Sequence, residues 1–203
     1  MVELAPDLVA RARRGDAVAA RALVDLYSPR VYALVGRILA TSPEAVDDVA
    51  QDSFIKVLAH LHHFDPRGPA PLGAWISTIA ARTALDSLRK TRRLRALPKE
   101  PFHEGSEIAS TEVPLDELID ARRLGERVAS AMNELAPEHR AALLLRIEHD
   151  LEYPEIARAL AIDVGTVKSR ISRARARLRE ALEDLRAKTP PPRTLRPTAG
   201  SNP

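Results

Sequence analysis

A run of prolines and acidic residues divides this chain in two, and that division constrains the fold more than any other feature. The run spans residues 96–114 and carries four glutamates together with Pro98, Pro101, Gly105 and Pro114. Proline cannot continue a helix or a central strand, so this segment is predicted to be an acidic, flexible linker. The flanking blocks, residues 1–95 and 115–188, are therefore predicted to be separate domains.

Both blocks have the composition of helical proteins. Aromatic residues make up only 3% of the chain, and Ala, Leu, Arg and Glu dominate, which favours helices over sheets. Apolar periodicity predicts helices at about 4–14, 17–27, 30–39, 44–61 and 75–93, and four more between 115 and 188. The predicted fold class is all-α, with two small helical domains joined by a flexible linker. Five prolines among residues 189–203 predict a disordered tail.

Several breaks between these helices have recognisable chemistry. Gly15 and Asp16 form a break with a plausible helix cap, and Thr41-Ser42-Pro43 supplies a second cap with proline near the first turn. The segment 65–71 contains three prolines and a glycine, so it is predicted to be a stiff loop.

Charge is distributed in stripes, although the formal net charge is only +3. Residues 82–95 carry six basic side chains and one acid, and residues 166–179 carry six basic side chains and no acid. Residues 44–52 reverse the sign, with four acidic side chains. Two basic stripes indicate two contacts with a polyanion, and the acidic stripe indicates a basic protein partner. The alternative is that these stripes are simply solvated helix faces.

The strongest local motif is a helix-turn-helix over residues 153–171. A short helix, a three-residue turn at 161–163 and a second helix capped by Asp163 have the spacing of this motif. Core positions of the second helix follow i, i+4, i+7, i+11 at Val167, Ile171, Ala174 and Leu178. The opposite face would enter a DNA major groove, with Lys168 and Arg173 donating to guanine acceptors. The competing interpretation is a helical interaction domain that binds no nucleic acid.

Both blocks resemble regions of the sigma-70 family of transcription initiation factors. Residues 155–157 and 164–170 look like region 4.2, and residues 47–57, 74–80 and 84–93 look like regions 2.2, 2.3 and 2.4. Their order, with a short linker and no further globular region, is similar to the minimal, extracytoplasmic-function group. The resemblance implies a sigma factor that directs promoter-specific initiation, responds to stress or another signal, and is controlled by an anti-sigma factor.

The resemblance also assigns roles to residues. It implies that core RNA polymerase is bound through the clamp helices of its largest subunit and the flap of its second largest subunit. The clamp-binding residues would be Asp47, Asp48, Gln51 and Asp52. Residues at the promoter minus-ten element would be Trp75, Arg82, Asp86, Arg89, Lys90, Arg92 and Arg93. Residues at the minus-thirty-five element would be Gly165, Thr166, Lys168, Ser169, Ser172 and Arg173.

Four positions in this scheme carry qualifications. Trp75 is predicted either as the wall of a base pocket or as plain core, and Asp86 as an ion-pair partner of Lys90 at i+4. Arg82 stands where many family members have Asn, so the family's minus-ten preference does not transfer. Ala161 replaces a frequent glycine in the turn, which makes the turn less favourable.

No cofactor or metal is expected. The chain has no cysteine, and the three histidines at 60, 62 and 63 lack a ligand motif. No nucleophile with its base, P-loop or dinucleotide motif is present, so an enzyme is not expected. No signal peptide or membrane span is predicted, which indicates a cytoplasmic protein, nucleoid-associated when active and brought to the inner membrane only by an anti-sigma factor. The alternative function is a helix-turn-helix regulator that is not a polymerase subunit.

Overall fold

The computed structural model describes residues 3–40, 42–68, 70–95 and 116–188, and these form helices and connecting turns without strands. The N-terminal helices are α1 (Pro6–Arg13), α2 (Ala17–Ile38), η1 (Pro43–Ala45), α3 (Val46–His60), η2 (Leu61–His63) and α4 (Leu72–Arg95). The C-terminal helices are α5 (Asp116–Glu134), α6 (Pro137–Glu148), α7 (Tyr153–Leu160) and α8 (Val164–Lys188). The all-α prediction is confirmed. The predicted linker and tail lie outside the described residues.

Helix α2 differs from its prediction. Two helices were expected on either side of Ser28-Pro29, but α2 runs through both residues without interruption. The Ser28 hydroxyl donates to the carbonyl of Val24 at 2.7 Å, and the apolar face of α2 is anchored by the buried side chains of Leu23, Tyr27 and Val31. Burial of this face outweighs the one backbone bond that proline removes.

The predicted breaks are reproduced in part. Asp16 caps α2 by accepting the amides of Val18 and Ala19 at 3.0 Å, as expected. Ser42 makes no capping bond through its side chain, and Pro43 opens a single 3-10 turn before α3. The segment before α4 contains turns and extended backbone in its described residues, as the prolines predicted.

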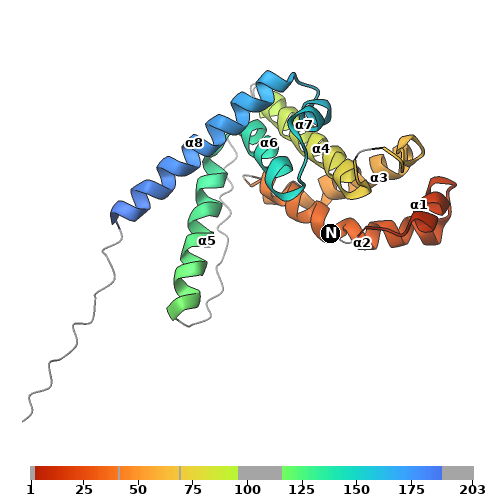
Figure 1. Cartoon of the computed structure of the whole chain (residues 1–203), viewed down its shortest axis with the longest axis horizontal. Coiled ribbons are helices and arrows are strands. Elements are labelled where there is room, and N and C mark those ends of the chain that lie inside the picture. The colour runs from red at the N-terminus through yellow and green to blue at the C-terminus, as the bar shows by residue number, and fades with distance from the viewer. Residues whose placement is uncertain (1–2, 41, 69, 96–115, 189–203) are drawn as a thin grey trace, which may run out of the picture.

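Helices α6, α7 and α8 form the compact part of the C-terminal half. Their shared core contains Leu143, Leu145, Ile156, Val167 and Ile171, each essentially inaccessible to solvent. Helix α8 continues far beyond this core, and in Figure 1 it and α5 extend from the end of the molecule opposite α1. The second helix of the helix-turn-helix is thus the start of α8, a helix longer than the motif requires.

The two halves pack directly against each other. Helix α4 contacts α6 and α7, and α2 contacts α6, so one continuous cluster of buried side chains runs through both halves. Polar groups are buried in this contact as well, including Arg140, which is 1% exposed. A flexible linker gave no reason to expect such packing, and the contact brings the two candidate nucleic-acid surfaces together.

Candidate nucleic-acid interface

The helix-turn-helix has the predicted local geometry. Asp163 caps α8 by accepting the backbone amide of Thr166 at 2.8 Å and its hydroxyl at 2.5 Å. These bonds, the hydroxyl first, hold the pKa of the Asp163 carboxyl below its ordinary value. In the turn, Ala161 has a φ of 52°, the left-handed conformation that glycine adopts more easily. The missing turn glycine is therefore tolerated at some cost in backbone strain.

The predicted DNA-facing side of α8 is only partly free. Gly165, Lys168, Ser172 and Arg173 are exposed, whereas Thr166 and Ser169 are half-buried. The Ser169 hydroxyl donates to the Thr166 carbonyl at 2.9 Å, and the Thr166 hydroxyl is bonded to Asp163. Lys168 and Arg173 are thus the long, exposed donors on this face. Behind them Val167 and Ala174 are fully buried, as the periodicity predicted.

The basic end of α4 is an exposed surface with one internal ion pair. Arg89, Lys90 and Arg93 are exposed and, together with Arg92, line one side of a shallow hollow. Asp86 pairs with Arg89 at 3.0 Å, one helical turn away at i+3. The predicted pair of Asp86 with Lys90 is therefore wrong in its partner. Arg89 at i+3 and Lys90 at i+4 both lie on the helix face of Asp86. The guanidinium of Arg89, which can donate two bonds to one carboxylate, forms the ion pair.

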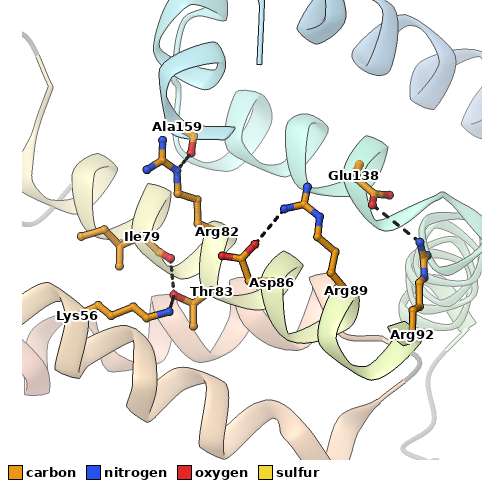
Figure 2. Close-up of polar contacts among 9 residues, drawn as sticks. All are labelled: Lys56, Ile79, Arg82, Thr83, Asp86, Arg89, Arg92, Glu138 and Ala159. Atoms are coloured by element: carbon orange, nitrogen blue, oxygen red, sulfur yellow. Dashed lines mark hydrogen bonds and ion pairs between the residues drawn. The ribbon is translucent and has the colours of Figure 1, made fainter. Parts of the chain in front are cut away.

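The Arg82 side chain is exposed, yet its guanidinium reaches the C-terminal half. Its guanidinium donates from Nε to the carbonyl of Ala159 and from Nη2 to the carbonyl of Arg158. Figure 2 shows Arg82 leaving α4 toward the end of α7, beside the Asp86–Arg89 pair. Further along the same helix, Arg92 lies 4.0 Å from the Glu138 carboxylate of α6. Two of the predicted minus-ten residues thus contact the C-terminal half.

Trp75 lies at the edge of the hydrophobic core. The side chain is half-buried, and its ring is tilted by 48° against Phe64 with the centroids 5.5 Å apart. Trp75 therefore packs on the core and keeps part of its ring accessible.

The acidic face of α3 is fully exposed and carries apolar side chains. Asp47, Asp48, Gln51 and Asp52 all lie in solvent. Beside them Ile55 is 65% exposed and Leu58 is 39% exposed. Ile55 falls at i+4 from Gln51 and at i+7 from Asp48, so its sequence position alone places it on this face. This apolar part of the face was not among the predicted polymerase-binding residues.

Two buried polar residues were also missed. His149 is 4% exposed, and its Nδ1 accepts a bond from Arg30 Nε at 3.0 Å and lies 2.9 Å from Ser77 Oγ. Burial, then Arg30 and Arg37, lowers the pKa of His149 to about 4. Since Nδ1 accepts from Arg30, the neutral imidazole carries its proton on Nε2, which is buried without a partner. No sequence signal marks either residue, because His149 bonds to Arg30 in the other half of the chain and Arg140 bonds to backbone carbonyls.

The histidine cluster shows no metal geometry. His62 and His63 have ring centroids 3.9 Å apart, but no carboxylate joins them. Among the described residues, no group of three or more His, Cys, Asp or Glu side chains is placed to hold a metal ion. Within that part of the chain, none of the helices has the length and apolarity to cross a bilayer.

Comparison with known proteins places both halves in one family. The model of Sigma-70 region 2 matches residues 23–94, and the model of Sigma-70, region 4 matches residues 125–178, together more than half of the chain. The ECF RNA polymerase sigma-E factor of Escherichia coli (strain K12) is 33% identical over 184 residues, which cover 88% of this chain and 94% of that protein. This chain belongs to the ECF sigma factors of the sigma-70 family.

Other relatives of this sigma factor agree. The RNA polymerase sigma-H factor of Pseudomonas aeruginosa is 34% identical over 88% of this chain and 93% of its own length. Among solved structures, CnrH in complex with the cytosolic domain of CnrY is 29% identical, with a TM-score of 0.54 over 87% of this chain and 96% of that chain. The region 2 match contains the α3 face and the basic end of α4. The region 4 match contains the helix-turn-helix, so each candidate surface lies inside a recognised region.

Proposed function

We propose that the acidic and apolar face of α3 docks this sigma factor on the clamp helices of the largest polymerase subunit. Four exposed polar side chains lie one to two helical turns before the exposed Ile55 and Leu58 on the same face, so the face combines polar and apolar groups as protein interfaces do. The carboxylates suit a basic partner and would steer association. Region 4 would contact the flap of the second largest subunit.

The promoter would be bound at two places. Arg89, Lys90, Arg92 and Arg93 would hold phosphates near the minus-ten element, with the accessible part of Trp75 against an unstacked base. Arg82 and Asp86 belong to the same surface. At the minus-thirty-five element, Lys168 and Arg173 would contact base edges, while Gly165, Thr166, Ser169 and Ser172 would lie against the groove. The first-turn amides of α8 would bind a phosphate.

The observation that carries this function is the presence of both sigma-70 regions in one chain, each with its exposed charged surface intact. The test is run-off transcription by purified core polymerase, with and without this protein, on promoter fragments. New specific start sites that depend on the protein are expected. A failure to direct any initiation would contradict the proposal.

Removing charge from the α3 face is expected to weaken core binding. The double variant Asp48→Asn and Asp52→Asn keeps the side-chain size, and both positions are exposed, so folding is expected to be unchanged. We expect core polymerase to bind at least about tenfold more weakly, with a matching loss of run-off product, because charge pairs across the interface are lost. The matched control is Asp7→Asn with Asp25→Asn, an equal charge change on α1 and α2. Equal weakening by both double variants would count against this docking face.

The loss of promoter binding is expected to depend on the DNA sequence when Arg173 is replaced, and to be independent of it when Arg93 is replaced. Arg173→Ala should lower transcription selectively at the cognate minus-thirty-five sequence, by about 1–3 kcal/mol of discrimination. Arg93→Ala should act equally on all promoters and reduce the salt dependence of binding by about one unit of slope. Holoenzyme binding to promoter variants, measured across a salt series, separates the two. A uniform loss with Arg173→Ala would make it a phosphate contact.

A regulator that acts without polymerase is the second candidate, favoured by the exposed Lys168 and Arg173 on α8. It requires tight duplex binding by the isolated protein and no effect on start-site selection.

We propose further that the chain has no catalytic activity, works in the cytoplasm with polymerase, and is inhibited by an anti-sigma factor. In support, the sigma factor RpoE of Bartonella quintana, similar in fold at 24% identity, was solved with the anti-sigma factor NepR.

A further inference from the structure

The residues just before α4 cannot cap this helix with a side chain. The carbonyl of Pro71 accepts the amide of Trp75 at 3.0 Å, which makes Pro71 the boundary residue of the helix. Neither Pro71 nor Ala70 has a side-chain oxygen, so these residues offer no acceptor to the amides of the first turn, which lack intrahelical partners. An acceptor for those amides has to come from another part of the chain or from water.

Glu3 supplies this acceptor from 70 positions away. Its Oε2 accepts the backbone amide of Gly73, the second residue of α4, at 3.3 Å. That amide is one of the two that a helix-capping side chain ordinarily satisfies, and the positive end of the helix dipole also favours a carboxylate there. Glu3 is therefore a side-chain cap of α4 that comes from before α1.

The position of the Glu3 carboxylate is held by Tyr27 of α2. The Tyr27 hydroxyl donates to Glu3 Oε2 at 2.7 Å and accepts the amide of Leu4 at 3.2 Å. Tyr27 is 2% exposed, and burial, followed by the bond to Glu3, raises the pKa of its hydroxyl above the ordinary value. The hydroxyl thus stays protonated and remains a donor, while Leu4 packs against the core.

Gly73 allows these side chains to approach the first turn of α4. A Cβ atom at this position would lie 2.9 Å from Arg30 Nη1, 3.0 Å from Glu3 Oε1 and 3.1 Å from Tyr27 Cε1. Contacts this short would force at least one of the three side chains to move. The glycine is therefore part of the same capping arrangement.

The capped turn carries Trp75, two residues after Gly73. One side of the indole contacts Phe64, with the ring centroids 5.5 Å apart, and the backbone of the first turn determines where the rest of the ring lies. Fraying of this turn would release that backbone. A preformed site binds its ligand more tightly than a site that has to be ordered on binding, so the cap matters for any base that Trp75 receives.

We propose that Glu3 is a positioning residue for the minus-ten site, which caps α4 across the fold and thereby holds Trp75 in place to receive an unstacked base. This proposal rests on the proposed function for the contact of Trp75 with DNA. The cap itself can be measured in the free protein, without polymerase or promoter.

The first experiment uses the fluorescence of Trp75, the only tryptophan of the chain. Glu3→Ala removes the acceptor and should make Trp75 in the full chain about twofold more accessible to quenching by acrylamide, because losing a helix cap frays the first turn. Glu3→Gln keeps an oxygen that can accept both bonds and should restore most of the protection. The matched control Glu183→Ala removes an exposed carboxylate from α8 and should leave the quenching unchanged.

Tyr27→Phe tests the same arrangement from its other end. This variant keeps the buried ring and removes only the hydroxyl that holds Glu3, so the chain should fold and the quenching of Trp75 should rise as it does in Glu3→Ala. Combining the two substitutions should add little to Glu3→Ala alone, because both break one chain of hydrogen bonds.

The second experiment asks whether the cap acts through the captured base. A promoter found by run-off transcription is made single-stranded over the minus-ten element of its non-template strand and bound to core polymerase with this protein. Glu3→Ala should weaken this binding about fivefold, because the site then has to be ordered on binding, and Glu3→Gln should bind like the wild type. Each minus-ten base is then removed in turn to leave an abasic sugar. At the position whose base is captured, Glu3→Ala and the wild type should bind equally.

Quenching that is unchanged in both Glu3→Ala and Tyr27→Phe, or that rises equally in Glu183→Ala, would overturn the cap. A weakening that persists on every abasic DNA, or no weakening at all, would overturn the positioning role. If the wild-type holoenzyme binds no promoter, the proposed function is wrong and the positioning role falls with it, while the quenching still decides whether Glu3 caps α4.

Discussion

Arg140→Ala is expected to lower the free energy of unfolding by about 3–5 kcal/mol, because a buried carbonyl without a donor costs about 1–3 kcal/mol and the lost side chain opens a cavity. The Arg140 side chain is 1% exposed, and its guanidinium bonds to three carbonyls. Those of Met132 and Asn133, at the end of α5, lie 3.1 and 3.2 Å from Nη1. That of Ile38, at the end of α2, lies 2.9 Å from Nη2. Alanine would remove this donor from all three carbonyls, of which that of Met132 still accepts the Leu135 amide at 3.2 Å, and would leave a cavity between the two halves.

Urea denaturation followed by circular dichroism measures this loss. Burial lowers the pKa of Arg140, yet an arginine stays charged, so the native interface holds a cation neutralised only by carbonyl dipoles. Arg140→Lys should recover part of the stability, because an ammonium reaches fewer of the carbonyls. Arg21→Ala, at a side chain 81% exposed, should change stability by less than about 0.5 kcal/mol. A loss below about 1 kcal/mol for Arg140→Ala would mean that water replaces the guanidinium without cost.

The helix-turn-helix could be predicted from the sequence because each of its determinants is local. The Asp163 cap, the buried Val167 and Ile171, and the turn between the helices depend on residues within a few positions of one another. The same local logic failed at Pro29, where burial of the α2 face outweighs the breaking tendency of proline. It also misassigned Asp86, because two basic side chains lay within its reach and spacing alone does not rank them.

The contact between the halves could not be predicted, and its chemistry explains why. Arg82 and Arg140 bond mainly to backbone carbonyls, which every residue carries, so no motif marks their partners. Arg30 and His149 are 119 positions apart, and neither shows unusual sequence surroundings. From the sequence alone, Arg82 is predicted to contact DNA because it lies on a basic helix, and the packing shows that its guanidinium bonds to α7. Long-range polar contacts of this kind depend on the assembled fold.

The stability of this protein is expected to fall between pH 7 and pH 5 because of His149. Its pKa is lowered from 6.5 to about 4, first by burial and then by Arg30 and Arg37. The native state keeps the imidazole neutral, whereas the unfolded chain binds a proton below about pH 6.5. The stabilisation is therefore fully present above that pH, declines as the pH falls, and is lost near pH 4. Linkage gives a decrease of about 2 kcal/mol from pH 7 to pH 5.

Denaturation at a series of pH values, in wild type and in His149→Asn, isolates this contribution. The asparagine amide oxygen can accept the Arg30 and Ser77 bonds but does not titrate, so its pH profile should be flatter by about the same 2 kcal/mol. His139, whose pKa is lowered by burial and by Arg170 and Arg173, contributes with the same sign in both proteins and cancels in the difference. Equal slopes would show that His149 is protonated or solvated in the native state. Such a result would also remove one of the buried bonds between α6 and the N-terminal half, because a protonated Nδ1 cannot accept the Arg30 donor.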